Sequence, residues 1–330
     1  MYNELQNIDK SYFYALGRVS VLSLKLLNND RLLLLAGAAT LEDAVKMLYE
    51  INYAGSFTVA NPNDFEEVLK LEWDSVTDFL KEESAADAVT KCFLLVNDIH
   101  NLKVLTKQKY LKQELNAVPL LKGLFDAADP TNLPKEITEA LALIDALEHK
   151  KPSVIDALLY KAYYKTVMRL LKKEKNSVIK NYFTTEIDCK NILSFFRFKK
   201  AALPKDGFKL QFIEDGSLPF ALFEKMFDIT PEESAGLFKE EAYTKYQDVV
   251  ASALEELQTD LPFIKTEQMC LEMQRNIINP HKSETDGILP LINYFLAKKT
   301  EIENLRLVLV CVKNKIDKEN IIVRLRKSYV

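Results

Sequence analysis

The sequence predicts an all-helical fold. Of its 330 residues, 48% are hydrophobic and 28% charged, which is an ordinary globular composition. Only 8 residues are glycine, about a third of the usual share, and glycine supplies the positive-φ positions that hairpins and phosphate loops need. Along most of the chain, apolar residues recur at steps of three and four, as they do on one face of a helix. These three observations indicate long helices joined by short connections.

The first helix is predicted from apolar residues that share one face between Ile8 and Leu26. "TLED" at 40–43 predicts a second helix start, because Thr40 can accept from free backbone N–H groups and the acid three residues later can reach back. That helix runs to about Tyr53. The same periodicity, with breaks at proline and asparagine clusters, predicts further helices after 61–64 and over 87–110, 152–171, 185–200, from 230, and over 288–315, with a short basic amphipathic helix in the tail at 317–330.

The segment 203–219, "LPKDGFKLQFIEDGSLP", is the least helical part of the chain. Two Asp-Gly pairs flank "FKLQFI", in which apolar and polar residues alternate. Asp-Gly is a frequent hairpin turn. We therefore expect a short hairpin or a loop here, without a larger sheet.

One short pattern occurs three times. "DIHNLKVL" begins at residue 98, "DCKNILSF" at 188 and "EIENLRLV" at 301, and each has an acid, then asparagine three residues later, then leucine or isoleucine. Residues three apart lie on one helix face, and a part-buried asparagine amide can bond a neighbouring backbone carbonyl or N–H group. We interpret the pattern as a repeated structural contact rather than a catalytic or ligand site. The six residues are Asp98, Asn101, Asp188, Asn191, Glu301 and Asn304.

A second pattern supports a repeat. "TLEDAVKMLYEINY" from Thr40 and "TPEESAGLFKEEAY" from Thr230 share threonine, glutamate, an acid, an apolar ninth residue and a fourteenth tyrosine; the middle copy retains mainly Thr131. Each copy precedes one acid-x-x-Asn segment, which predicts three similar helical domains at 1–115, 116–215 and 216–330. Three copies could form a pseudo-three-fold ring or an open solenoid, and their spacing does not choose between these.

The charge balance excludes some partners. The net charge is −4 and the pI is near 5.7, whereas nucleic-acid binders show a basic excess. Residues 64–87 are strongly acidic and residues 161–180 strongly basic. Both runs are either solvated helix faces or docking surfaces of opposite sign.

Residues for catalysis or ligand binding are scarce. The four cysteines are far apart in apolar surroundings, and the three histidines have no metal-ligand spacing. The sequence has no GxxxxGK[ST], GxGxxG, GxSxG or HExxH motif. We therefore expect no catalytic, cofactor or metal site and no nucleotide binding. We find no signal-peptide pattern and no apolar run of spanning length, so we expect a cytoplasmic chain, peripheral to any membrane it meets.

The two ends of the sequence resemble one family. "LINYFLAKKTEIENLRLVLVCVKNKIDKENIIVRLRKSYV" at 291–330 is similar to the C-terminal end of the C subunit of V- and A-type rotary ATPases, whose eukaryotic equivalent is the d subunit. Residues 12–55 look like the family's N-terminal pattern, and "DIHNLKVL" and the "EDGS" turn also match. The resemblance extends over nearly the whole chain. It is loose between 112 and 180, and the chain departs from the family at "FFRFKKAALPKDG".

The resemblance implies three similar domains in a pseudo-three-fold, funnel-like arrangement. It also implies a non-catalytic central-stalk subunit, which seats the rotating stalk on the membrane rotor ring and couples ATP turnover to proton or sodium transport. The alternatives are an unrelated helical-repeat adaptor and, less favoured, an all-α enzyme. A coupling subunit needs surfaces for stalk and ring, and the candidate interface residues are Lys165, Arg169, Lys172, Lys173, Arg324, Arg326 and Lys327.

Overall fold

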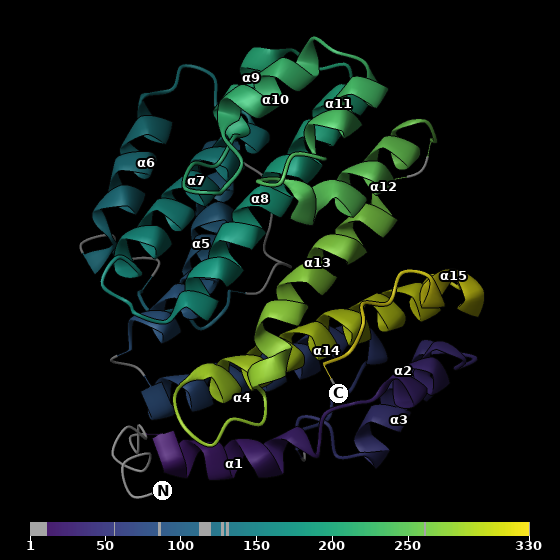
Figure 1. The fold of residues 1–330 in the computed structure, drawn as a ribbon. Coiled ribbons are helices and arrows are strands. Elements are labelled where there is room, and N and C mark those ends of the chain that lie inside the picture. Colours follow the sequence, from purple (N-terminus) through teal and green to yellow (C-terminus); the bar gives the residue numbers. More distant parts are fainter. Residues whose placement is uncertain are drawn as a thin grey trace, which may run out of the picture. The chain divides into compact units, whose positions relative to one another are not determined.

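The computed structural model describes residues 12–55, 57–84, 87–111, 120–126, 129, 132–260 and 262–329. Every regular element within these ranges is a helix (Figure 1), which confirms the all-helical prediction. The chain divides into two compact units, one made of 1–86 with 278–330 and the other of 87–277. We call them the terminal unit and the middle unit. The arrangement of three domains about a pseudo-three-fold axis stays a prediction.

The terminal unit is built around one long helix, α14 (Leu289–Lys313). Helix α14 has buried residues on all its faces, as expected of a central helix. It packs against α1 (Phe13–Ser23), α2 (Asn29–Ala36), α3 (Leu41–Glu50) and α4 (Phe65–Ser84). The rings of Trp73 on α4 and Phe295 on α14 lie 4.9 Å apart. The core of this unit therefore runs along α14.

Polar caps set where the helices of the terminal unit begin. The side chains of Asn28 and Thr40 accept the backbone N–H groups of Arg31 and Asp43 and so cap α2 and α3. The 3-10 helix η3 (Pro62–Asp64) begins after Asn61 and leads into α4. Another 3-10 helix, η6 (Asn279–His281), precedes α14. These caps satisfy backbone donors that a helix N-terminus leaves free. The break at 61–64 and the start at Thr40 are confirmed.

The middle unit contains two long helices, α5 (Ala88–Leu111) and α8 (Ser177–Lys200). Helix α7 (Pro152–Leu170) packs on α5, α8 and α6 (Lys135–Ala146), whereas α8 packs on α12 (Gln247–Leu257). Phenylalanines fill one part of this unit: the ring of Phe208 lies within 6.1 Å of six others, which are Phe195, Phe198, Phe212, Phe220, Phe223 and Phe227. The remaining helices are α10 (Phe220–Phe227), α11 (Pro231–Leu237), η5 (Thr244–Tyr246) and α13 (Ile264–Ile278), whose last residue falls in the terminal unit.

The prediction of a hairpin or a loop at 203–219 is wrong for the first part of the segment, and of the two only the loop is found in the second part. Residues 205–211 form a helix, α9 (Lys205–Gln211), and residues 212–219 form a loop. Phe208 explains the difference, because a helix places it in the phenylalanine cluster, where it is fully buried. Apolar and polar residues alternate here as in a strand, but tertiary packing of Phe208 favours a helix instead.

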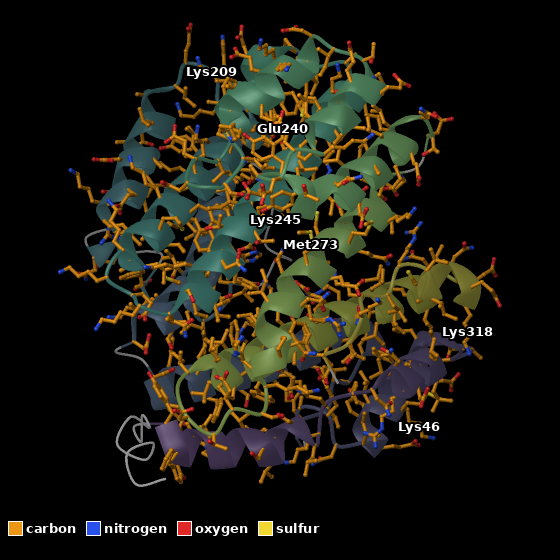
Figure 2. The ribbon with its side chains drawn as sticks, viewed as in Figure 1. Lys46, Lys209, Glu240, Lys245, Met273 and Lys318 are labelled. Atoms are coloured by element: carbon orange, nitrogen blue, oxygen red, sulfur yellow. The ribbon has the colours of Figure 1, made fainter. Side chains whose placement is uncertain are left out.

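The tail differs from the sequence prediction in a smaller way. Its helix, α15 (Lys318–Ile322), is only five residues long, and the basic residues from Arg324 onward follow it. The predicted first helix begins at Phe13 in the described chain, and Ile8 and Thr131 lie outside the described residues. Exposed lysines such as Lys46 and Lys318 in the terminal unit and Lys209 in the middle unit lie on the surface (Figure 2).

Candidate functional site

The second acid-x-x-Asn pair fastens α8 to the loop that follows α9. Asn191 donates to the carbonyl of Ile213 at 2.8 Å and accepts the N–H group of the same residue at 2.9 Å. Asp188, fully buried, accepts the backbone N–H groups of Ser217 and Leu218 at 3.0 and 2.9 Å. We call such a pair, with the backbone it bonds, a joint, and name each joint after its helix.

The α5 joint repeats this geometry. Asn101 donates to the carbonyl of Leu121 at 2.7 Å and accepts that residue's N–H group at 2.8 Å. Asp98 accepts the N–H groups of Leu124 and Phe125 at 2.9 and 3.1 Å. The bonded backbone lies 20 residues after the asparagine in the α5 joint and 22 in the α8 joint. Within the middle unit, one sequence pattern therefore makes the same contact twice.

The α14 joint uses both ends of the chain. Asn304 donates to the carbonyl of Arg326 at 3.0 Å and accepts its N–H group at 2.9 Å, again 22 residues later. Glu301, however, accepts the N–H group of Leu27 at 2.6 Å, near the beginning of the chain. The loop between α1 and α2 and the tail that follows Ile322 are thus held by one helix of the terminal unit.

Two joints depend on a glycine. A Cβ atom at Gly123 would lie 1.8 Å from Asp98 Oδ1, and one at Gly216 would lie 2.3 Å from Asp188 Oδ1. Residue 215, just before the second glycine, has φ +69°, a conformation that asparagine, aspartate and glycine adopt most readily. The Asp-Gly pair at 215–216 therefore forms a turn that packs against the Asp188 carboxylate, and it does not form a hairpin.

Tyrosines complete two of the joints. Tyr246 donates to Asp188 Oδ2 at 2.5 Å, and Tyr53 donates to Glu301 Oε1 at 2.9 Å. Burial, followed by the neighbouring carboxylate charge, raises the pKa of each tyrosine well above its usual value. The sequence repeat paired Tyr53 with Tyr243, but the tyrosine that contacts the acid in the α8 joint is Tyr246. The offset of three residues could be found only in the structure.

The α14 joint also holds a buried cation. Lys298 lies 2.7 Å from Glu301 and 2.5 Å from Glu72 on α4, and its Nζ atom lies 4.8 Å from the centre of the Tyr53 ring. Burial alone would lower the pKa of Lys298, but the two carboxylates outweigh it and the pKa is raised. This ion cluster therefore fastens α4 to α14.

In the middle unit, each acid of a joint bonds backbone that comes after the acid's own helix along the chain. The predicted boundaries after residues 115 and 215 separate Asp98 from Leu124 and Asp188 from Ser217, and so divide both contacts. The three-repeat division stays a prediction, and these bonds favour boundaries farther along the chain. Each acid-x-x-Asn pair bonds a different part of the chain. The hydrogen bonds of the described residues do not bring two pairs together into one site.

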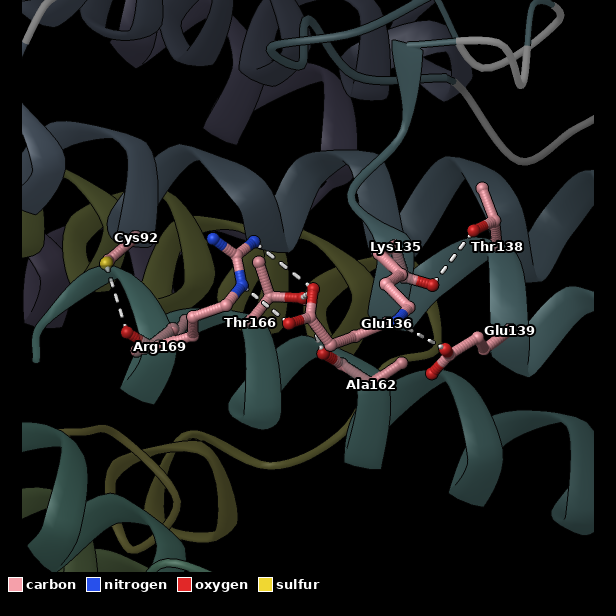
Figure 3. A network of polar contacts seen from close by, with 9 residues as sticks. Cys92, Lys135, Glu136, Thr138, Glu139, Ala162, Thr166 and Arg169 are labelled. Carbon is pink, nitrogen blue, oxygen red and sulfur yellow. Dashed lines mark hydrogen bonds and ion pairs between the residues drawn. The ribbon is translucent and has the colours of Figure 1, made fainter.

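The basic run on α7 is partly committed to the fold. Arg169 makes a two-bond ion pair with Glu136 on α6, at 2.5 and 3.2 Å (Figure 3), and Thr166 also donates to that carboxylate. The side chains of Lys165, Lys172 and Lys173 are exposed, and no ion pair is found for them among the described residues. Of the four candidate interface residues in this run, these three lysines are therefore the free ones. Lys165 lies on α7, and Lys172 and Lys173 lie in the turn after it; we call the three the α7 lysines.

In the tail, Arg326 is also engaged. Its backbone belongs to the α14 joint, and its side chain pairs with Glu303. Arg324 and Lys327 remain exposed. The tail lies in the terminal unit, and the α7 lysines lie in the middle unit.

Several acids of the run at 64–87 are engaged within the terminal unit. Four ion pairs to the rest of the terminal unit involve its acids: Glu66 with Arg306, Glu72 with Lys298, and Glu82 and Glu83 with Arg18. Asp74 pairs with Lys70 one turn earlier on α4. The ion pairs of Glu66, Glu72, Glu82 and Glu83 therefore help to hold α4 against α1 and α14.

Within the described ranges, no group of three or more His, Cys, Asp or Glu side chains is arranged to hold a metal ion. The four cysteines are buried and free. Burial raises the pKa of Cys92 to about 12, so its thiol stays protonated at neutral pH. Of the helices in the described part of the chain, none combines the length and apolar character needed to cross a membrane.

Fold and joints together define an all-helical protein whose repeated polar motif is structural. Residues 15–323 match the family model of the ATP synthase (C/AC39) subunit. The chain belongs to this family, and its resemblance to the C subunit of rotary ATPases is confirmed. The alternative of an unrelated helical-repeat adaptor is set aside.

Its relatives are distant in sequence. The chain is 24% identical to the C subunit of the A-type ATP synthase of Thermococcus gammatolerans, over 89% of this chain and 84% of the relative. It is 23% identical to the C subunit of the V-type sodium ATPase of Enterococcus hirae, over 81% of this chain and 83% of the relative. With the C subunit of the V-type ATP synthase of Thermus thermophilus it shares 27% identity over 51% of this chain and 58% of the relative.

Proposed function

We propose that this chain is a non-catalytic central-stalk subunit of a V/A-type rotary ATPase. In that role it couples the rotating stalk to the membrane rotor ring during ATP-linked proton or sodium transport. The observation that carries the proposal is membership of the ATP synthase (C/AC39) subunit family along nearly the whole chain. The relatives named above belong to ATP synthases and to a sodium ATPase.

The joints suit such a role physically. A coupling subunit must transmit torque without bending, and a buried asparagine or carboxylate bonded to backbone at two points leaves little freedom between a helix and its loop. Each of α5, α8 and α14 has such a joint. The chain needs no catalytic group for this, and we expect it to bind neither nucleotide nor nucleic acid.

We further propose that the protein sits on the cytoplasmic side of the membrane, peripheral to it, and that the α7 lysines contact an acidic surface of the ring or its lipids. One surface ion pair contributes only about 0–1 kcal/mol, so a single substitution should change little. Arg169 is excluded from the test because its reversal would break the ion pair with Glu136.

The experiment is co-purification from native membranes, followed by binding of the isolated ring across a salt series. The triple variant K165E/K172E/K173E should bind the ring more weakly than wild type, while circular dichroism stays unchanged. The matched control reverses three scattered exposed lysines, Lys151, Lys209 and Lys239. If the chain does not co-purify with other components of the ATPase, the proposed function is wrong. If it does, and both triple variants bind like wild type, only the assignment of the α7 lysines is wrong.

A further inference from the structure

Helix α1 presents an apolar stripe that nothing in the described chain covers. Tyr14, Val21 and Leu24 are 75%, 59% and 85% exposed. With Gly17 they are spaced by three, four and three residues, so they lie on one face of the helix. The opposite face, which includes Leu16 and Val19, is buried against the terminal unit. Contiguous exposed apolar residues of this kind mark interaction sites.

The spacing of the stripe indicates the shape of its occupant. Positions 14, 17, 21 and 24 follow the a and d places of two heptads, the pattern by which one helix receives another. A flat or irregular partner would not need this register. The stripe covers about 15 Å of helix, which is roughly three turns of a partner helix.

Gly17 forms a depression in the middle of this stripe. A Cβ atom there would meet nothing within 4 Å, so neither close packing nor a positive φ explains the glycine. Glycine inside a helix is less favourable than alanine. A glycine that weakens a helix and gains no packing contact in return is expected at a functional position. Between Tyr14 and Val21, the missing side chain leaves a hole of the kind that receives a large side chain from a facing helix.

A groove continues from the depression. It has a volume of about 670 Å³, and its wall on α1 combines the small residues Gly17, Ser20 and Ser23 with the larger Phe13, Leu16 and Val19. Pro290 and Ala297 of α14 form part of the other wall. Small residues on the α1 side allow a second helix to approach closely.

Charge adds to the description of the partner. Residues 12–29 contain no acid, and their two cations are Arg18 and Lys25. Arg18 is already paired with Glu82 and Glu83, whereas Lys25 is exposed next to Leu24. A partner helix would therefore gain from a carboxylate that lies beside Lys25.

We infer that α1 is a docking site for a helix of a neighbouring protein in the ATPase complex, one that carries apolar residues at heptad spacing, a large side chain over Gly17 and a carboxylate near Lys25. The choice of the complex as the source rests on the function proposed above. The docking face lies in the terminal unit, and the α7 lysines lie in the middle unit.

The first test substitutes a photo-cross-linking residue at Tyr14, Val21 or Leu24 in the full chain, within the complex isolated from native membranes. A docked helix should give cross-links to one partner segment, at sites that advance by three or four residues from one position to the next. Leu143 on α6, which is also exposed, serves as the control position. Cross-links only to lipid, to this chain itself or to a second copy of it would overturn the inference.

The second test fills the depression. Gly17→Leu should leave the fold intact, because the site is open and leucine favours a helix. It should weaken retention of the chain in the complex by about tenfold, the loss expected when one central contact of an interface is blocked. Gly236→Leu is the matched control, since Gly236 is also helical with nothing within 4 Å of its Cβ position. Equal retention of both variants refutes the docking site while leaving the proposed function intact. Failure of the wild-type chain to co-purify refutes both.

Discussion

Asn191 and Ile213 are joined by two hydrogen bonds, one in each direction, at 2.8 and 2.9 Å. A side-chain amide can do this because it carries a donor and an acceptor side by side, like a peptide group. The same two bonds join Asn101 to Leu121. Each asparagine side chain therefore makes the pair of hydrogen bonds that a residue of a neighbouring β-strand would make.

Removing either asparagine should cost more than a surface hydrogen bond. In N191A, the backbone N–H and carbonyl groups of Ile213 would both be left buried without a partner. Each buried group left unsatisfied costs about 1–3 kcal/mol, so the two groups together should lower the free energy of unfolding by about 2–6 kcal/mol in N191A. The loss in N101A should be smaller, because Leu121 is only half-buried. Urea denaturation measures this. N320A, at an exposed asparagine of α15, should change the midpoint little, and an N191A midpoint equal to that of N320A would contradict the prediction.

The two joint glycines should not tolerate a methyl group. G123A and G216A would drive Cβ into Asp98 or Asp188 and force the turn away from the helix. Overpacking of a tight site costs about 1–3 kcal/mol. G236A supplies the comparison, because its methyl group would meet nothing and alanine favours the helix. Thermal melts should therefore move in opposite directions, and stabilisation in all three variants would show that the turns adjust freely.

Lys298→Met should strongly destabilise the terminal unit. It leaves Glu72 and Glu301 buried without their cation, and breaking a buried pair in this way costs about 3–5 kcal/mol. Chemical denaturation of K298M beside K313M, at an exposed lysine, measures the cost. Adding E72Q to K298M should restore part of the loss. Equal stability of K298M and K313M would show that the ion cluster contributes nothing.

The same lysine predicts a pH dependence. Since the pKa of Lys298 is raised in the fold above 10.5, its contribution is fully present below pH 10.5 and is lost as pH rises through the folded value. Above pH 10.5, wild type should therefore lose stability more steeply than K298M. Unfolding at a series of pH values, with the difference between the two proteins as the readout, tests this. Parallel curves would argue against it.

Arg169→Ala should destabilise the contact between α6 and α7. Burial by itself raises the pKa of Glu136, but the hydrogen bonds and charge of Arg169 prevail and the pKa is lowered from 4.5. The contribution is thus present above pH 4.5 and lost as pH falls through the folded pKa. R169A should be less stable than wild type by about 1 kcal/mol at neutral pH, and the two proteins should converge in acid. Arg31→Ala, at an exposed arginine, is the control.

Much of the local structure could be predicted from the sequence. Thr40 and Thr230 cap helices as expected, and at Thr230 the Glu233 side chain also reaches back to close a capping box. Caps can be predicted from the sequence because they involve residues only three apart. The helix at 205–211 was missed because Phe208 owes its position to rings distant in the chain.

The candidate site divides in the same way. The acid and asparagine of each joint could be found because they repeat, and their three-residue spacing already placed them on one helix face. Their partners could not, since Leu121, Ile213 and Arg326 share no side-chain chemistry: each contributes only its backbone. A backbone acceptor leaves no mark in the sequence. Gly123 and Gly216 were the one available trace of these turns.

The sequence by itself determined the all-helical class, several helix starts such as those at Thr40 and Thr230, the repeated acid-x-x-Asn pattern and the family resemblance, because each depends on residue type at short spacing. Only the tertiary structure decided that one helix, α14, holds two segments far apart in the chain, Leu27 through Glu301 and Arg326 through Asn304. It also decided which charges are free and which are paired, such as Arg169. The physical reason is that pairing depends on which helix faces meet, and long-range packing sets those meetings.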